Sequence, residues 1–351
     1  MPESSPIQSK PVLGDEPTPG MIFRLRKAMP APAKKAFQFG KAALQLATAT
    51  LYDARRFARY SGVFDRDGHP SAAKANITKY YHMIEKGLTL PSPRPGFGRQ
   101  AIEDLCLKVR KAVDRGIHSN EIIYAIDAIA GYQAFNEERG VANPPWIAET
   151  LAFASAKGLK CSGAPIKRPD PMVEVDSETL LRFMTSRHSV RHFSDAPVPD
   201  EVLTAAARAA QAAPCVCNRQ ASRVTFARDP QIRSKLLSCQ NGNRGFGDTA
   251  PIVALITTDL RSFMEPSERY QAWIDGGLFA ENLLLAFHAM GYGACPLNWS
   301  AMPGQDRQLR ALDIVPESEQ VIMMVAIGAP HEQSRVARSQ RYDVRDVMRL
   351  L

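Results

Sequence analysis

The sequence has no stretch of about 18 consecutive apolar residues, the length that a helix needs to cross a bilayer. Its best candidate, 42–52 (AALQLATATLY), is too short and contains polar residues, which favours an amphipathic helix. The opening residues MPESSPIQSK lack an apolar stretch behind a basic start, so no secretory signal is visible. We therefore expect a cytoplasmic protein with no integral membrane segment.

Cysteine is present, but not in a pattern that holds a metal. The cysteines show no CxxC spacing and no histidine-rich partner segment, so a zinc site is not expected and the thiols should stay reduced. The Cys215-x-Cys217 spacing would strain a disulfide, and small buried thiols are common. The six cysteines are Cys106, Cys161, Cys215, Cys217, Cys239 and Cys295.

Excess charge is also modest, and most of it lies near the N-terminus. The 351 residues carry a formal net charge of +8, of which residues 1–60 contribute ten basic against four acidic side chains. A solvated basic tail and attraction to an anionic membrane or polyanion both remain open. Nucleic acid is not an expected partner, because the basic residues lack interleaved aromatics and no nucleic-acid-binding fold is visible.

The first half of the chain is expected to be mostly α-helical. Residues 1–33 are rich in proline and should form a flexible leader, because such a composition buries too little apolar surface to offset chain ordering. The region 34–160 should follow as a helical N-terminal region, ending near a proline-rich connector at 156–175. Its expected helices span 34–60, a segment that begins near 75 and is capped by Gly87, 100–115 and 119–140.

The second half, 176–351, mixes helical and strand patterns. The alternation indicates an α+β fold, a mixed sheet covered by helices. Expected helices span 177–186, 200–212, capped by Asp200, and 271–290, and expected strands span 223–228, 252–258 and 321–328.

Several motifs follow one another in this half. Arg187-His188-Ser189-Val190-Arg191 precedes PCVCNRQ at 214–220, and GYGACPLNW follows at 291–299. Over 176–351 the chain resembles the nitroreductase family of FMN-dependent oxidoreductases, whose phosphate-binding start is usually Arg-x-Ser-x-Arg/Lys. The family segment Pro-Ser-Ser-x-Asn-x-Gln-Pro appears with Asn218 and Gln220 kept, whereas Cys215, Cys217 and Ala221 depart from it.

The resemblance implies an FMN site. Guanidinium groups bind phosphate oxygens through charge-assisted hydrogen bonds, which suits Arg187 with Ser189 as the phosphate clamp. It further implies that Arg191 stabilises the reduced ring, that Asn218 contacts the ribityl chain or ring edge, and that the Asn298 backbone N–H faces N5. The full expected set is Arg187, His188, Ser189, Arg191, Asn218, Gln220, Asn243, Arg244, Pro296, Leu297, Asn298, Trp299, Arg338 and Arg341.

The implied activity is hydride transfer from NADH or NADPH to bound FMN and on to a small organic acceptor with a nitro, quinone or enone-like group, in ping-pong order. No catalytic side chain is expected, because the flavin N5 carries the chemistry. The family also implies a homodimer that builds each flavin site from both subunits.

Two other functions stay open. One is a flavin-dependent dehydrogenase or oxidase acting on a biosynthetic substrate, such as a polysaccharide-linked one, and the other is a non-catalytic binding module on the same fold. Retention of both arginines and of Asn218 argues against the module. The stretch 75–98, YYHMIEKGLTLPSPRPGFG within it, is expected to form either a lid over the flavin or an extra packing layer.

Overall fold

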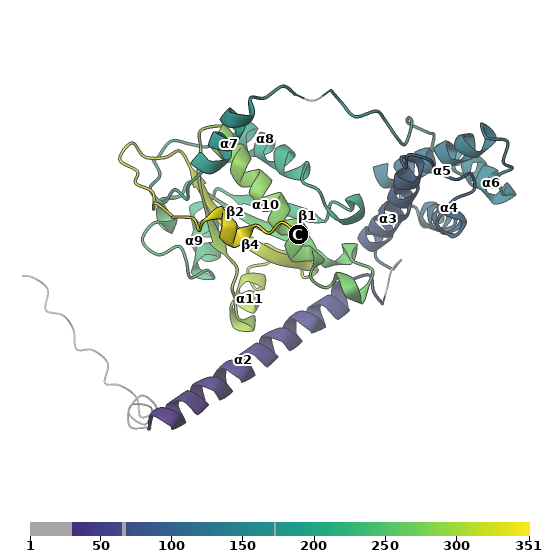
Figure 1. Cartoon of the computed structure of the whole chain (residues 1–351). Coiled ribbons are helices and arrows are strands. Elements are labelled where there is room, and N and C mark those ends of the chain that lie inside the picture. Colours follow the sequence, from purple (N-terminus) through teal and green to yellow (C-terminus); the bar gives the residue numbers. More distant parts are fainter. Residues whose placement is uncertain (1–29, 65–67, 172) are drawn as a thin grey trace, which may run out of the picture. The chain divides into compact units, whose positions relative to one another are not determined.

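The computed structural model describes residues 30–64, 68–171 and 173–351 (Figure 1). The chain divides into two units, Met1–Tyr52 and Asp53–Leu351. The predicted leader, 1–33, lies almost wholly outside the described residues, and residues 31–33 already belong to helix α2 (Ala31–Tyr60). Among the described helices, none combines the length and apolar character that crossing a bilayer requires.

The larger unit begins with a helical region whose own core is apolar. Helices α3 (Pro70–Leu88), α4 (Arg99–Asp114), α5 (Asn120–Glu137) and α6 (Pro145–Ala156) bury a shared cluster that includes Ile77, Leu105 and Ile129. Helix α6 was not predicted, although Pro145 stands at a first-turn position that suits proline.

Gly87 is not the helix cap that the sequence suggested. Helix α3 continues to Leu88, and Thr89 is its C-cap. A Cβ at position 87 would lie 2.0 Å from Cε2 of Phe97, so this position needs glycine because the Phe97 ring packs against the helix backbone.

A four-stranded sheet forms the centre of the remaining chain. Its strands are β1 (Ser222–Ala227), β2 (Ile252–Asp259), β3 (Gly293–Asn298) and β4 (Glu319–Gly328), in the order β1-β2-β4-β3. Each neighbouring pair is antiparallel. Among the described residues, parallel pairing is limited to the isolated bridge between Ser189 and Ala294, so the expected mixed character rests on that bridge alone.

Helices cover both faces of this sheet. Helices α8 (Asp200–Gln211) and α10 (Gln271–Ala289) pack on one face, and α9 (Pro230–Ser238) and α11 (Pro303–Arg310) lie against the other (Figure 1). Successive side chains of β2 point to opposite faces of the sheet, which explains the two layers. Ile252 and Ala254 join the first core, and Val253 and Leu255 join the second. Asp200 lies in the first turn of α8, and Pro199 rather than Asp200 is its N-cap.

Short elements complete the unit. They are α7 (Ser177–Ser186), α12 (Val344–Val347) and the 3-10 turns η1 (Val216–Asn218), η2 (Gly247–Thr249), η3 (Leu260–Ser262) and η4 (Pro266–Glu268).

The helical region is attached to the sheet-bearing part around Met264. Gly62 donates its backbone N–H to the Phe263 carbonyl at 2.8 Å, and Met264 is buried in one cluster with Ala72 and Ala75 of α3. Lys79 forms an ion pair with Glu265 at 3.4 Å. These contacts fix α3 beside the loop that carries η1, where part of the candidate site lies.

Candidate active site

The segment Arg187–Arg191 leaves α7 and runs beside the start of β3. Val190 donates its backbone N–H to the Ala294 carbonyl at 3.1 Å, and Ser189 forms a parallel bridge with Ala294. A Cβ on Gly293 would lie 2.8 Å from Cβ of Val190, so the close approach of the two segments requires glycine there.

This arrangement brings the positive charges of Arg187 and Arg191 close to the start of β3. The Nη1 atom of Arg187 is buried and has no hydrogen-bond partner among the described residues. Burial raises the pKa of the Cys295 thiol, while the charges of Arg191 and Arg187 oppose that rise. Burial and the charge of Arg187 lower the pKa of His288. An unpaired buried guanidinium nitrogen is costly, and an anionic ligand would satisfy it.

A cavity of about 320 Å³ lies at this cluster. Arg187, His188 and Val190 line it together with Leu284 and His288 of α10. His188 uses Nδ1 in a 2.6 Å contact with the Ser186 carbonyl, and Ser186 Oγ lies 2.7 Å from His288 Nε2. The histidines therefore organise the end of α7 around the arginine.

The second group of predicted residues lies on the loop around η1. Three residues of this loop have positive φ although they are not glycine, namely Cys217 (47°), Asn218 (52°) and Gln220 (48°). Such conformations cost about 1 kcal/mol or more each and persist where surrounding contacts enforce them. Asn218 and Gln220 both remain exposed.

Buried polar contacts enforce this loop conformation. Arg219 is buried and pairs with both carboxylate oxygens of Glu268, at 2.5 and 3.1 Å, and also donates to the Ser262 carbonyl at 2.7 Å. Asp275 of α10 accepts the Val216 N–H at 3.3 Å, and burial raises the pKa of its carboxyl. The loop is thus fixed from both sides.

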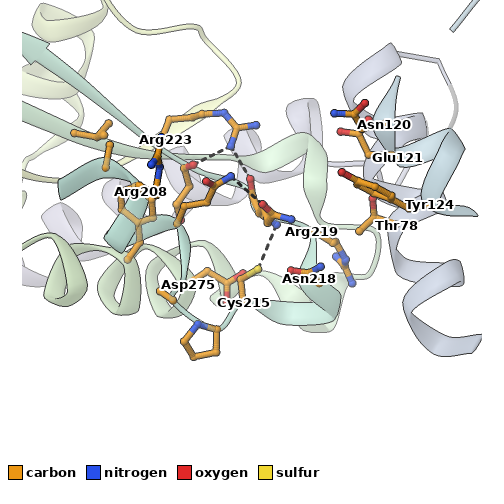
Figure 2. A pocket seen from close by; sticks show the side chains of 18 of the residues that line it. Thr78, Asn120, Glu121, Tyr124, Arg208, Cys215, Asn218, Arg219, Arg223 and Asp275 are labelled. Atoms are coloured by element: carbon orange, nitrogen blue, oxygen red, sulfur yellow. Dashed lines mark hydrogen bonds between the residues drawn. The ribbon is translucent and has the colours of Figure 1, made fainter. Parts of the chain in front are cut away.

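A cavity of about 700 Å³ opens beside this loop (Figure 2). Asn218 and Gln220 line it together with Asp275 from α10. Arg208 and Arg223 lie on one side of it, and Tyr124 lies on the other (Figure 2). No sequence motif marks Arg208, Arg223 or Tyr124 as site residues, because only the folded chain brings them together.

The third predicted group lies where β3 ends. Pro296, Leu297 and Asn298 belong to β3, and Trp299 follows directly after it. The Asn298 carbonyl accepts from Gln240 Nε2 at 3.0 Å, and Trp299 Nε1 donates to Asp306 at 3.4 Å.

Asn243 and Arg244 have different environments. The amide of Asn243 donates to the carbonyls of Leu237 and Gln240, at 2.8 and 2.7 Å, which closes the turn after α9. Arg244 is exposed. Asn243 therefore has a structural role in this chain whether or not it also contacts a ligand.

The C-terminal arginines are exposed. Arg341 donates to the Ser339 carbonyl at 2.8 Å. No hydrogen bond or ion pair between described residues joins Arg338 or Arg341 to Arg187, so their place in a phosphate clamp stays a prediction.

The first two groups lie apart within one chain. The cavity at Arg187 reaches His288 of α10, whereas the cavity at Asn218 reaches Asp275 of the same helix. At 1.5 Å per residue, these two α10 positions are about 20 Å apart along the helix. The two cavities share no lining residue. Within one chain, the two groups therefore lie toward opposite ends of α10.

Comparisons with known proteins identify sequences and structures that are similar to this chain. The sequence profile of the Nitroreductase family matches residues 184–239 and 237–329. Protein DrgA of Synechocystis is 30% identical over 42% of this chain and 82% of its own length. The FMN reductase (NAD(P)H) of Bacillus subtilis is 26% identical over 44% of this chain and 67% of its own. An FMN-dependent nitroreductase structure from Clostridium difficile covers 48% of this chain and 97% of its own, with 24% identity and a TM-score of 0.41.

The chain therefore belongs to the Nitroreductase family. This membership confirms the family resemblance, the nitroreductase-like α+β fold and the predicted class of enzyme, an FMN-dependent NAD(P)H oxidoreductase. The helices α3–α6 lie outside the matched range, which begins at residue 184.

Proposed function

We propose that this chain oxidises NADH or NADPH and passes the electrons through bound FMN to a small organic acceptor that carries a nitro, quinone or enone-like group. The observation that supports the proposal best is the buried, unpartnered Nη1 of Arg187, beside Ser189 and Arg191. A phosphate dianion fits this donor set, because guanidinium and hydroxyl groups donate to its oxygens.

The chain's own residues have distinct parts in this proposal. Arg187 and Ser189 hold the phosphate, with Arg338 and Arg341 as further cations from the C-terminal segment. Arg191 places a fixed positive charge beside the ring, where it favours the reduced form. FMN, when bound, accepts a hydride equivalent and returns electrons to an acceptor. Asn298 offers its backbone N–H toward the ring, so no acid or base side chain is required.

We expect ping-pong order because the nucleotide and the acceptor use one and the same binding surface at the flavin ring. The oxidised nucleotide leaves before the acceptor enters, because both must reach the same ring edge. Cys215 and Cys217 are free thiols, and burial raises the pKa of Cys215, so this thiol stays protonated at neutral pH and the proposal assigns it no chemistry.

We further propose a homodimer in which one copy supplies the Arg187 group and the other the Asn218 group. The separation of the two groups along α10 supports it, as do apolar side chains left exposed on α10 and α7. Ile274 is 53% exposed and Leu181 is 63% exposed. Exposed large apolar side chains that cluster on neighbouring helices are typical of a protein interface.

Anaerobic mixing of the purified protein with each nucleotide tests the proposed reaction. We expect a yellow protein that releases FMN on denaturation and whose visible flavin absorbance bleaches with NADH or NADPH and returns when menadione is added. Flavin that neither nucleotide bleaches would contradict this electron source and favour the dehydrogenase or oxidase alternative. A folded, colourless protein that ignores added FMN would favour the binding module.

A further inference from the structure

We propose that the cavity beside Asn218 is the acceptor-binding site, that α3 and α5 form its outer wall, and that Arg208 and Arg223 select acceptors bearing an anionic group such as a carboxylate. This inference rests on the proposed function and names the substrate class for that site. The wall comes from helices that the family profile does not cover, whereas Arg208 and Arg223 lie within the matched range.

The cavity is large and lined by side chains from both parts of the unit. Its volume of about 700 Å³ lies within the range of small-molecule sites. In Figure 2, Arg208 and Arg223 lie on one side, and Glu121 and Tyr124 lie on the other, with Asn218 between the two sides. A ligand held between these sides would touch the residue that the family motif assigns to the flavin.

The arginine side of the cavity carries unneutralised charge. Neither Arg208 nor Arg223 forms an ion pair with another described residue. The Nη1 atom of Arg223 donates to the carbonyls of Gln220 and Ser222, at 2.6 and 2.8 Å, which orients the guanidinium without cancelling its charge. Glu319 lies within electrostatic reach of Arg223, but its carboxylate accepts from Thr257.

Other arginines nearby differ in this respect. Arg219 pairs with Glu268. Arg228 follows strand β1, which contains Arg223, and pairs with Asp200 at 2.7 Å. Charge-assisted hydrogen bonds from Arg208 and Arg223 therefore remain open to a ligand, and planar carboxylates match the geometry of a guanidinium.

Two acidic residues, Asp275 and Glu121, also line the cavity. Asp275 is buried and accepts hydrogen bonds from Val216 and Gln271. Glu121 stands across the cavity beside Tyr124 (Figure 2). An anionic group therefore binds at the arginine side, and the rest of the acceptor lies toward α5.

The aromatic wall is held in place. Tyr124 contacts the buried ring of Tyr81 edge to face, with ring centroids 6.3 Å apart. Tyr81 belongs to α3, which the Lys79–Glu265 ion pair and the buried Met264 attach to the sheet-bearing part. This packing favours a fixed wall over a lid, and Tyr124 then limits acceptor length.

Calorimetric titration of the FMN-loaded full chain with two matched probes tests the inference. 4-Nitrobenzoate and 4-nitrobenzamide share a nitro group and a shape but differ in charge. We expect wild type to bind the benzoate about tenfold or more tightly. Arg223→Gln and Arg208→Gln should each remove most of that preference, whereas Arg228→Gln, which removes the same charge outside the cavity, should keep it. Measurements in 0.15 M salt screen long-range effects.

The outcomes separate this inference from the proposed function. Equal binding of the two probes by wild type, or equal effects of Arg223→Gln and Arg228→Gln, would overturn the selectivity even if NAD(P)H bleaches the flavin. If the protein prefers the benzoate but neither NADH nor NADPH reduces its flavin, the anion selectivity is supported and the reductase proposal is contradicted. Tyr124→Ala should weaken both probes alike, and an unchanged affinity for both would remove α5 from the site.

Discussion

At the scale of single residues, Arg219 and Glu268 show how this chain fixes a functional loop. Their side chains are 1% and 14% exposed, and two hydrogen bonds join them. Glu268 also accepts from the backbone N–H groups of Met264 and Glu265, at 2.7 and 3.1 Å. The pair therefore connects the loop of Asn218 to the turn at Met264 and Glu265, which α3 contacts.

The same pair predicts a pH-dependent loss of stability. Burial opposes ionisation of Glu268, but the bonds and charge of Arg219 outweigh burial and lower the pKa of Glu268 below its usual 4.5. Because the folded pKa lies below the unfolded one, the pair stabilises fully above pH 4.5 and loses its effect as pH falls toward the folded pKa.

We expect Glu268→Gln to lower the free energy of unfolding by about 3 kcal/mol at pH 7, since it leaves a buried guanidinium without its counter-charge. The difference from wild type should shrink as pH falls below 4.5. Urea denaturation at a series of pH values measures it, with the exposed Glu103→Gln as control. A difference that stays constant from pH 7 to pH 3.5 would contradict the assigned pKa shift.

Single residues also show the limits of sequence reasoning. Ser189 and Arg191 were singled out by their motif, and their segment is paired with Ala294 through the Ser189 bridge and the Val190 N–H. Asn243 bonds its own turn, which a motif cannot reveal because the partners are backbone carbonyls. Arg208 and Arg223 meet Tyr124 only through tertiary packing, so nothing local in the sequence marks them.

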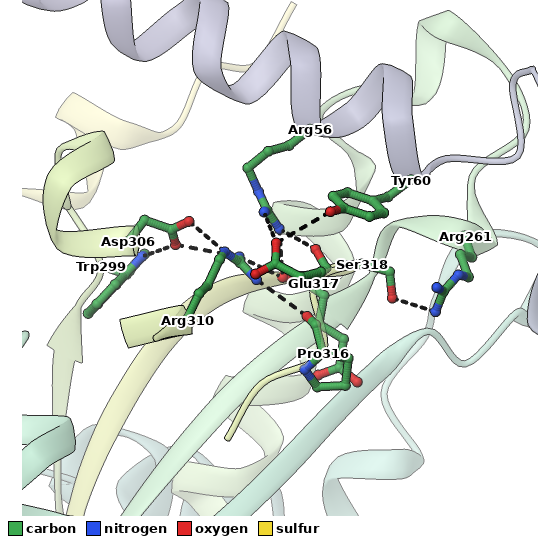
Figure 3. Close-up of polar contacts among 10 residues, drawn as sticks. Arg56, Tyr60, Arg261, Trp299, Asp306, Arg310, Pro316, Glu317 and Ser318 are labelled. Atoms are coloured by element: carbon green, nitrogen blue, oxygen red, sulfur yellow. Dashed lines mark hydrogen bonds and ion pairs between the residues drawn. The ribbon is translucent and has the colours of Figure 1, made fainter. Parts of the chain in front are cut away.

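At the scale of elements, the buried Arg56 joins the last turns of α2 to the segment that leads into β4. Arg56 is 6% exposed and donates to the carbonyls of Glu317 and Glu319, at 2.8 and 3.2 Å, and to the Glu317 carboxylate at 3.3 Å (Figure 3). Tyr60 also donates to that carboxylate at 3.4 Å. Arg310 supports the same segment by donating to the Glu319 carbonyl at 2.9 Å.

Arg56→Ala should therefore release the end of α2 without unfolding the sheet. We expect faster amide hydrogen exchange across 53–60, and a loss of about 2 kcal/mol in unfolding free energy, because the variant loses the partly buried hydrogen bonds of Arg56 to the Glu317 and Glu319 carbonyls. Arg55→Ala, one residue away and exposed, is the matched control. If both variants exchange at the wild-type rate, Arg56 does not anchor this element.

The elements differ in how well the sequence predicted them. Strands β1, β2 and β4 follow apolar or β-branched runs and were predicted within two residues of their ends. Strand β3 was missed because GACPLN contains glycine and proline and lacks β-branched residues. Among the described strands β4 is its one neighbour, and the isolated Ser189–Ala294 bridge lies on its other side, so β3 stands at the sheet edge, where a proline is tolerated.

At the scale of the whole molecule, the compact unit is larger than the family motif. The unit runs from Asp53 to Leu351, whereas the family profile matches 184–329. Contacts around Met264 and Arg56 join segments that lie on either side of the predicted boundary near 156–175. Such long-range contacts leave no signal in local composition.

The central proposal concerns the whole molecule. We propose an FMN site built by the Arg187 group of one copy and the Asn218 group of another. Arg187→Ala should weaken FMN binding about tenfold or more, since it removes a charge-assisted donor to phosphate. Asn218→Ala should weaken it about fivefold. Arg182→Ala, an exposed arginine on α7, should bind FMN as wild type does.

The most direct test is FMN titration, followed by fluorescence quenching, of dimers that contain one Arg187→Ala copy and one Asn218→Ala copy. A site shared between copies predicts one site of wild-type affinity and one weak site per mixed dimer, because one of the two sites then has both intact residues. Mixed dimers without any wild-type site, or a protein that stays monomeric when loaded with FMN, would contradict it.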